Sequence, residues 1–352
     1  MTATTTSAAG PGVPASIPAP PTAPFGTVFT ATMAYVHYAD GAWGEPVLGP
    51  VAPFSFHPAA HVLHYASACF EGLKAHRGVD QVVRIFRADT HVQRMRNSAE
   101  VLCLPPPPAA MLDTMIRQVT KASDAEVPAA PGSLYLRPTL VGTEENVGAA
   151  AAPSASALLF VLASPVGDYF SGGIRPLTIA IETEQPRTIP AFGAVKSGAN
   201  YVMALRPTLE AKKNLGADQV LFAPGGLVQE TGAANFMLID AERVITPALN
   251  TTFLHGVTRS SLLTLAGDLG YVVEEREVTV DEVVAWAGRA HAEAALTGTA
   301  AVLSPVGKLV VKGQSIPVGT GGVGAHAMRL RQALTDLHRA ATPDPYGWLT
   351  LP

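Results

Sequence analysis

Residues 191–201 read AFGAVKSGANY and place a single lysine, Lys196, among residues with very small side chains. An ordinary surface lysine does not need such neighbours. A lysine whose amine must be approached by a flat ring does need them, because larger side chains would block the approach. On this stretch alone, a lysine at the rim of a domain with its charged end in solvent is the more common situation. The rest of the sequence decides between these two interpretations.

Length and composition indicate a large soluble chain with small-molecule partners. The chain has 352 residues, of which 48% are hydrophobic and 15% charged, and its formal net charge is -4. This length exceeds what one hydrophobic core usually supports, so we expect two domains. The slightly acidic balance gives no reason to expect nucleic acid or an anionic membrane as a partner. Cys69 and Cys103 form neither a CxxC pair nor a metal-ligand spacing, so we expect no metal and a reduced, cytoplasmic setting.

The order of the segments predicts a tail followed by two domains. Residues 1–24 carry no charge and lack the basic start and apolar block of a signal peptide, so we predict a disordered tail. No later stretch has the length and hydrophobicity of a membrane-spanning helix. Strand-like and helix-like segments mix without strict alternation, which favours an α+β fold. The Gly- and Pro-rich residues 166–176 are the expected interdomain loop between a small domain (25–165) and a large one (177–352).

A carboxylate and an amide follow the lysine along the chain. Glu230 ends the apolar stretch LVQE, Asn235 begins the next one, and only small residues lie between them. A carboxylate in such a place could hold a proton on a heterocyclic nitrogen through a charge-assisted hydrogen bond. An ordinary glutamate in a hairpin is the alternative, and on these residues alone it is favoured.

Two turns in the second half have the pattern of anion sites. A glycine precedes a helix whose first residues are Val257 and Thr258, and the free N–H groups of a helix start bind phosphate. A plain helix start is equally compatible with this pattern. In a second turn, backbone N–H groups at Thr299, Ala300 and Ala301 could meet a carboxylate. A lysine, a carboxylate and a phosphate seat together fit pyridoxal phosphate, which needs an amine, a partner for its ring nitrogen and an anion clamp.

From residue 25 to the end, the sequence resembles the fold-type IV pyridoxal-phosphate enzymes, and among them the branched-chain amino acid aminotransferases. The matching motifs, in the order of the family, are VLHYASACFEGLKAHRG (62–78), FRADTHVQRMRNSA (86–99), SLYLRPTLVGTEENVG (133–148), SPVGDYF (164–170), VKSGANY (195–201), QETGAANF (229–236), GVTRSSLL (256–263) and TGTAAVLSPV (297–306). The resemblance implies the D-amino acid aminotransferase-like fold. The cofactor would lie between a smaller N-terminal α/β domain and a larger C-terminal domain that binds it.

The resemblance also implies roles for individual residues at the cofactor. Lys196 would be the Schiff-base lysine and would carry the proton during the reaction. Glu230 would pair with the pyridine nitrogen, and Tyr201 would bind the phenolic oxygen. The phosphate would be held by Arg94, by the backbone of Val257 and Thr258, and by the Thr299 hydroxyl.

For the substrate, the resemblance implies an aromatic box and a carboxylate turn. Phe29, Tyr65, Phe70 and Tyr135 would line the box. The backbone of Ala300 and Ala301 would hold the α-carboxylate, and Arg137 would meet the second carboxylate when glutamate is the amino donor. The implied reaction exchanges the amino group between an L-branched-chain amino acid and 2-oxoglutarate, in a homodimer whose site is completed by the second subunit.

Departures from the family pattern keep other functions open. The run before the lysine is RTIPAFGAV (187–195) where family members usually carry several glycines, and Pro207 stands in the helix that follows. These changes would affect the shape of the pocket more than the type of reaction. The alternatives are an aminotransferase with a bulky or aromatic substrate in secondary metabolism, and a catalytically inactive binding protein of the same fold. A D-amino acid transaminase or an aminodeoxychorismate lyase fits the motifs less well.

Overall fold

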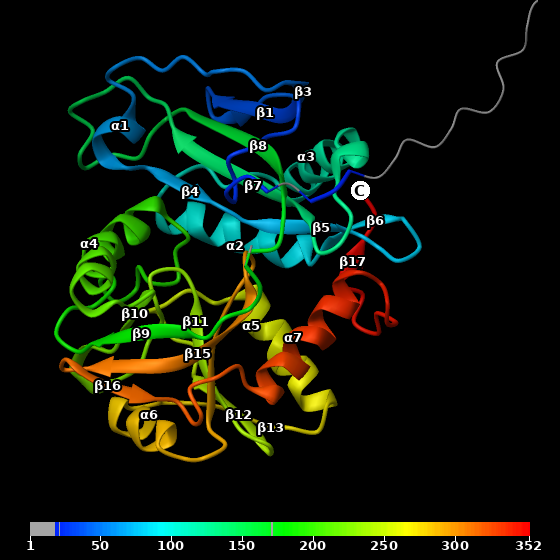
Figure 1. Ribbon diagram of the computed structural model, residues 1–352. Helices are drawn as coiled ribbons and strands as arrows, with labels where there is room; N and C mark the ends of the chain where they lie inside the picture. The colour runs from blue at the N-terminus through cyan, green and yellow to red at the C-terminus, as the bar shows by residue number, and fades with distance from the viewer. Residues whose placement is uncertain (1–17, 21, 170–171) are drawn as a thin grey trace, which may run out of the picture.

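Two β-sheets form the two halves of the structure, one above the other in Figure 1. The computed structural model describes residues 18–20, 22–169 and 172–352. Most of the tail expected over residues 1–24 therefore lies outside the described residues, as do residues 170–171 of the expected interdomain loop.

The first sheet is antiparallel and comes mainly from the N-terminal half of the chain. Its order is β17-β6-β5-β7-β8-β1-β2, with β3 paired to β1 and β4 paired to β7. The strands are β1 (Thr32–Ala39), β2 (Ala42–Trp43), β3 (Val47–Pro50), β4 (Ala68–Phe70), β5 (Leu73–Arg77), β6 (Val83–Phe86), β7 (Ser133–Gly142), β8 (Ala157–Val166) and β17 (Leu349–Thr350). Three helices, α1 (His61–Tyr65), α2 (Ala88–Val101) and α3 (Ala109–Ala122), and the short 3-10 helix η1 (Asp124–Glu126) accompany this sheet.

The core of this half is built by helix faces packed on the sheet. Val92, Met95 and Ala99 of α2 are three and four residues apart, so they share one face of the helix, and all three are buried. Met115 and Ile116 of α3 belong to the same buried cluster. This packing fixes the orientation of α2, which also carries His91 and Arg94.

The second sheet is mixed and comes from the C-terminal half. Its order is β10-β9-β15-β14-β11-β12-β13, with β16 paired to β15; the β9–β10, β9–β15 and β12–β13 pairs are parallel. The strands are β9 (Leu177–Glu182), β10 (Gln219–Phe222), β11 (Asn235–Ile239), β12 (Arg243–Pro247), β13 (Val272–Arg276), β14 (Glu293–Gly298), β15 (Val302–Val311) and β16 (Gln314–Pro317). The helices of this half are α4 (Gly198–Leu215), η2 (Pro224–Gly226), α5 (Val257–Asp268), α6 (Val280–Ala287) and α7 (Ala325–His338).

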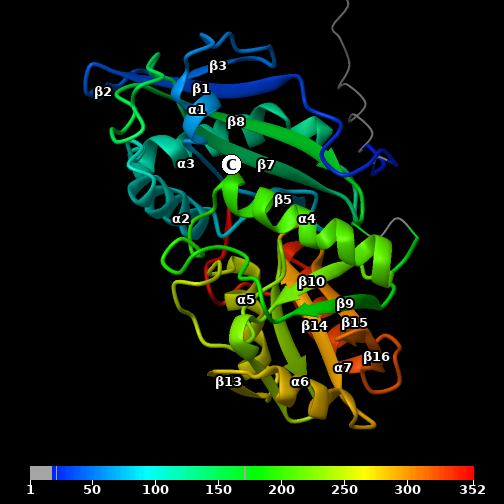
Figure 2. The same cartoon turned by 90° about the vertical axis from the view of Figure 1, so that its left-hand side faces the viewer.

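Helix α4 lies at the junction of the two sheets, where it contacts β4 of the first and β10 of the second (Figure 2). Ser197 caps it by accepting a hydrogen bond from Ala199 N, and Gly216 ends it at a φ of 62°. Pro207 stands inside this helix, which continues through it without a break. The Thr208 hydroxyl donates to the Ala204 carbonyl in the turn around the proline.

The two halves are joined at the far end of the chain as well. The last strand, β17, pairs with β6 and so returns to the first sheet. Two sheets of different type, each with its helices, confirm the expected α+β class. Within the described part of the chain, no helix combines the length and the hydrophobicity needed to cross a membrane.

Candidate active site

A cavity of about 830 Å³ lies between the two sheets and receives side chains from both. Most of the residues that the sequence singled out line it. They are Phe70, Arg94, Tyr135, Arg137, Lys196, Tyr201, Glu230, Val257, Thr258, Thr299, Ala300 and Ala301. Phe29 and Tyr65 are not among the lining residues. Segments far apart in the sequence are thus brought to one space.

Lys196 is held by backbone contacts immediately before α4. Its N–H donates to Ser98 Oγ at 3.0 Å, and its carbonyl accepts from Phe70 N at 3.0 Å. The side-chain amine donates to Tyr201 Oη at 2.9 Å. Tyr201 is in the first turn of α4, so the start of the helix sets the distance between the two groups. The amine and the phenol therefore face the same part of the cavity.

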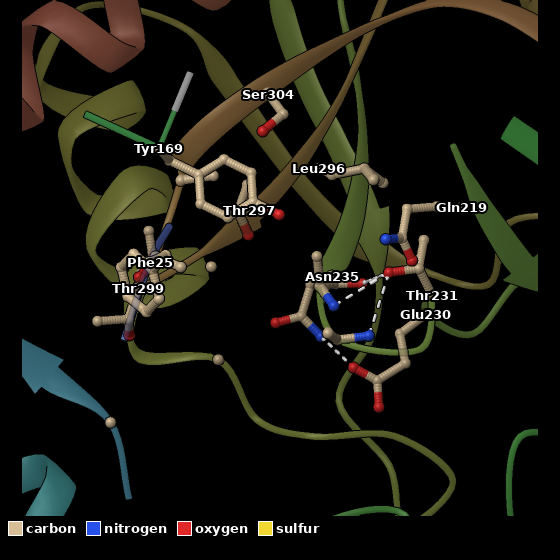
Figure 3. Close-up of a pocket in the computed structure, with 18 of the residues that line it drawn as sticks. Phe25, Tyr169, Gln219, Glu230, Thr231, Asn235, Leu296, Thr297, Thr299 and Ser304 are labelled. Atoms are coloured by element: carbon tan, nitrogen blue, oxygen red, sulfur yellow. Dashed lines mark hydrogen bonds between the residues drawn. The ribbon is translucent and has the colours of Figure 1, made fainter. Parts of the chain in front are cut away.

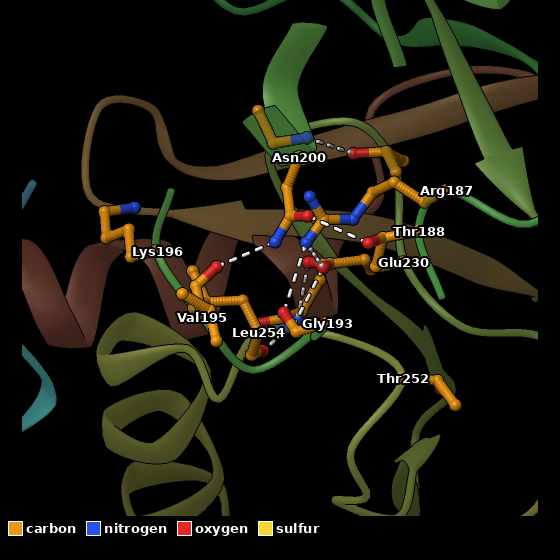
Figure 4. Close-up of polar contacts among 12 residues, drawn as sticks. Arg187, Thr188, Gly193, Val195, Lys196, Asn200, Glu230, Thr252 and Leu254 are labelled. Atoms are coloured by element: carbon orange, nitrogen blue, oxygen red, sulfur yellow. Dashed lines mark hydrogen bonds and ion pairs between the residues drawn. The ribbon is translucent and has the colours of Figure 1, made fainter. Parts of the chain in front are cut away.

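Glu230 is 2% exposed and its two oxygens have different partners. Oε1 accepts from Leu254 N at 2.9 Å and lies 2.5 Å from Arg187 Nη2 (Figure 4). Oε2 accepts from Asn235 Nδ2 at 3.3 Å. Burial raises the pKa of Glu230 to about 7, while the charge of Arg187 and the Leu254 N–H act in the opposite direction. The carboxylate is thus a buried acceptor with one oxygen still open to a donor from the cavity.

Arg94 is fixed by a carboxylate that the sequence did not single out. Its Nε and Nη2 donate to Glu71 at 2.6 and 2.9 Å, and its Nη1 donates to the His255 carbonyl at 2.9 Å. His91 contacts the same carboxylate at 2.7 Å. Burial alone would raise the pKa of Glu71, but the charges and hydrogen bonds of Arg94 and His91 hold it well below its usual range. The guanidinium is therefore held in one orientation at the cavity wall.

The start of α5 lies beside Arg94 at the same wall. Gly256 is its N-cap and brings no side chain to satisfy the first N–H groups of the helix. A Cβ at this position would lie 2.0 Å from Asn235 Oδ1, so only glycine allows the close approach. Val257, Thr258 and Thr299 line the cavity next to this helix start. The arrangement is suited to a phosphate group.

Another part of the cavity wall is aromatic and carries an arginine. Arg137 donates to Tyr135 Oη at 2.7 Å, and its guanidinium lies 4.6 Å from the centre of the Phe70 ring. Phe25 packs on Tyr135 with ring centres 4.9 Å apart, and Figure 3 shows Phe25 and Tyr169 on the side away from Glu230. This side of the cavity is therefore aromatic, with the Arg137 guanidinium against the rings of Phe70 and Tyr135.

Two residues expected in the aromatic box lie elsewhere. Phe29 is 50% exposed, and Phe25, four residues earlier, takes a place in the cavity wall. Tyr65 is half-buried outside this cavity and donates its hydroxyl hydrogen to the Val147 carbonyl at 2.5 Å. The alternation along a strand predicts which residues share a face, but the segment 25–29 precedes β1 and has no such pattern.

Three side chains at or behind the wall were missed by the sequence analysis. Lys74 is buried and donates to the Ala300 carbonyl at 2.8 Å, which orients the turn expected to bind a carboxylate. Burial lowers its pKa to about 8. Glu71 stands in the motif CFEGL and could have been found there, directly after Phe70. Arg187 gave no signal, because its partner Glu230 is 43 residues further along the chain.

Comparison with known proteins identifies the family of the chain. The family model described as amino-transferase class IV matches residues 68–309. The branched-chain-amino-acid aminotransferase of Mycobacterium tuberculosis (strain ATCC 25618 / H37Rv) is 37% identical over 340 residues, covering 92% of this chain and 91% of the relative. The branched-chain-amino-acid aminotransferase 2 of Bacillus subtilis (strain 168) is 36% identical over 338 residues, covering 93% and 91%.

Solved structures show the same fold. The T.th. branched-chain amino acid aminotransferase with pyridoxamine 5'-phosphate superposes with a TM-score of 0.75 at 28% identity, covering 92% of this chain and 99% of that one. The same enzyme complexed with N-(5'-phosphopyridoxyl)-L-glutamate gives a TM-score of 0.72 at 28% identity, covering 90% and 97%. These matches confirm the resemblance seen in the motifs and the two-domain fold. The chain belongs to the amino-transferase class IV family.

Proposed function

We propose that this protein is a pyridoxal-phosphate-dependent aminotransferase that exchanges the amino group between an L-branched-chain amino acid and 2-oxoglutarate. The observation that carries the proposal is that the Lys196 amine, the Tyr201 hydroxyl and the Glu230 carboxylate line one cavity together with the uncapped start of α5. The names of the relatives support the same reaction class.

The residues present fit this cofactor chemically. The start of α5, Thr299 and Arg94 would hold the phosphate, and Oε2 of Glu230 would accept a hydrogen bond from the protonated ring nitrogen. Tyr201 would bind the phenolic oxygen. When bound, pyridoxal phosphate supplies an aldehyde that condenses with amines and a ring that accepts the electrons of the cleaved Cα–H bond.

The side chains of this protein then have separable tasks. Lys196 would hold the cofactor through its aldehyde carbon, with loss of water, until the amino group of the substrate displaces it. The freed Lys196 amine would then carry the proton between the substrate Cα and the cofactor C4′. The Tyr201 hydroxyl, 2.9 Å away, would orient that amine. Glu230 would keep the ring nitrogen protonated, because a carboxylate stabilises the positive charge beside it.

Substrate choice follows from the aromatic side of the cavity. Phe25, Phe70 and Tyr135 would surround an aliphatic side chain, while Arg137 would pair with the second carboxylate of glutamate. The Ala300 and Ala301 backbone would bind the α-carboxylate, in a turn oriented by Lys74. One pocket would in this way accept an aliphatic and an acidic substrate in turn.

We further propose a cytoplasmic homodimer with domain limits at residues 25–165 and 177–352. Exposed apolar side chains support the second copy: Phe29, Leu63 and Val147 are 50%, 61% and 62% exposed. Tyr65, which contacts the Val147 carbonyl, would then extend toward the site of the second subunit. Size-exclusion chromatography with light scattering tests the dimer.

The substrate proposal is tested by adding L-leucine, L-glutamate, L-tryptophan or D-alanine to the cofactor-loaded protein and following its visible absorbance. We expect L-leucine and L-glutamate to bleach the yellow band. Bleaching by L-tryptophan and L-glutamate without L-leucine would replace the branched-chain substrate by an aromatic one. Bleaching by D-alanine alone would reverse the stereochemistry that we propose.

A further inference from the structure

Arg187 is a buried arginine beside the cavity, and none of the roles described so far uses it. It is 2% exposed and stands at the start of the segment 187–195, where the sequence departs from its family. Its Nη2 lies 2.5 Å from Glu230 Oε1 and 3.4 Å from the Gly193 carbonyl (Figure 4). A buried guanidinium needs a partner of opposite charge, and Glu230 supplies it.

The segment that carries Arg187 is tied to the lysine by a hydrogen-bond network. The Asn200 side chain donates to the carbonyls of Phe192 and Val195, both at 2.9 Å, and accepts from the Thr188 hydroxyl at 2.9 Å. Val195 directly precedes Lys196. The position of Arg187 is therefore set by the same loop that sets the position of the catalytic amine.

The contacts of Glu230 divide its two oxygens between the protein and the cavity. Oε1 is occupied by Arg187 and by Leu254 N, and these two contacts fix the plane of the carboxylate. Oε2 has one long contact to Asn235 and keeps room for a further donor. Lys196 and Arg94 also act on Glu230 through their charges, but the Lys196 amine donates to Tyr201, and Arg94 donates to Glu71 and to the His255 carbonyl.

We propose that Arg187 is a positioning residue for the ring nitrogen of the cofactor: it favours the ionised form of Glu230 and, by occupying Oε1, leaves Oε2 for the ring nitrogen. The proposal rests on the proposed function, since it assigns the nitrogen-binding carboxylate a partner. Without the guanidinium, no other cation within ion-pair distance among the residues that the structure describes would balance the buried negative charge, and the carboxyl would take up a proton more readily. A protonated carboxyl pairs less strongly with a pyridinium, because the interaction loses its charge.

The test measures binding of the cofactor and of its deaza analogue, in which carbon replaces the ring nitrogen. The variants are Arg187→Met, which removes the charge, and Arg187→Lys, which keeps it. Arg206→Met is the matched control, since Arg206 pairs with Glu210 at the surface with its side chain 87% exposed. Dissociation constants of pyridoxal phosphate and of deaza-pyridoxal phosphate are measured by fluorescence quenching, and each apoprotein is checked by its thermal melt.

We expect Arg187→Met to weaken binding of pyridoxal phosphate by roughly ten- to a hundredfold, the worth of one charge-assisted hydrogen bond. Binding of the deaza analogue should change by less than about threefold, because the analogue has no ring nitrogen to pair with Glu230. Arg187→Lys should recover a large part of the loss, and Arg206→Met should match the wild type. In a Glu230→Gln background, Arg187→Met should add little.

Equal losses for both ligands would overturn the inference, since a merely structural arginine would not distinguish them. So would unchanged binding of both ligands in Arg187→Met. If Arg187→Met does not fold, the dissociation constants of the two ligands can still be compared in Arg187→Lys and in the Glu230→Gln background. Failure of the wild type to bind pyridoxal phosphate would instead refute the proposed function, so the two failures are distinguishable.

Discussion

Removing the Glu71 carboxylate tests whether Arg94 is held at the cavity wall by a buried ion pair. In Glu71→Gln, one oxygen becomes an NH2 group. In the wild type, Glu71 Oε2 accepts from Arg94 Nη2 at 2.9 Å and from Gly72 N at 3.0 Å, and it lies 2.7 Å from His91 Nδ1. An NH2 group there would face donors, and the Arg94 guanidinium would be left buried without an opposite charge. An amide on the Oε1 side would face Arg94 Nε at 2.6 Å.

Breaking a buried pair by removing one partner costs about 3–5 kcal/mol. Glu71 is 1% exposed, so little solvent is present to compensate the charge of Arg94. We therefore expect Glu71→Gln to lower the free energy of unfolding of the apoprotein by about 3–5 kcal/mol in equilibrium urea unfolding. Because the pKa of Glu71 is held below its usual range, its contribution is present above its unfolded pKa, so the loss should stay constant between about pH 5 and 8.

Glu210→Gln is the matched control, because it breaks an ion pair of 2.8 Å whose side chains are 87% and 57% exposed. Surface pairs are worth about 0–1 kcal/mol, so this variant should remain close to the wild type. If Glu71→Gln is no less stable than Glu210→Gln, Arg94 is not held through Glu71. The proposal that a fixed Arg94 helps to hold the phosphate beside the start of α5 would then be wrong.

Three further outcomes are expected. Burial lowers the pKa of His338 from 6.5 to about 3, so the free energy of unfolding should fall as the pH drops below 6.5. His338→Phe should reduce the slope of this fall by about 1.4 kcal/mol per pH unit, measured by urea unfolding between about pH 6.5 and 4.5. A Cβ at Gly193 would lie 2.0 Å from the Thr252 carbonyl carbon, so Gly193→Ala should lose about 3 kcal/mol in thermal melts, unlike Gly267→Ala, where nothing lies within 4 Å. Arg137→Met should raise the KM for 2-oxoglutarate roughly tenfold in a coupled assay, with the KM for L-leucine nearly unchanged.

The parts of the site that were found from the sequence are those whose geometry is local. Lys196 and Tyr201 are five residues apart across the start of a helix, so their meeting follows from the cap at Ser197. Gly256 before α5 likewise predicts a helix start whose first N–H groups have no side-chain cap. Such features need only a few residues of chain, and short-range rules describe them.

The parts that were missed depend on contacts between distant segments. Arg187 and Glu230 pair across 43 residues, and Lys74 reaches the carbonyl of Ala300 across 226. Phe25 enters the cavity where Phe29 was expected, because the irregular segment before β1 has no periodicity that would indicate its buried side. Tertiary packing decides these positions.

Lys196 is central to everything proposed here, as the lysine that carries the cofactor. The most direct measurement is to load the protein with pyridoxal phosphate, reduce it with borohydride and locate the label by peptide mass spectrometry, with Lys196→Ala as the control. Lys74, the other lysine shown here beside the cavity, is already engaged with the Ala300 carbonyl. We expect one label, on Lys196, that is lost in Lys196→Ala. A label on Lys74 in the wild type, or none at all, would contradict the assignment.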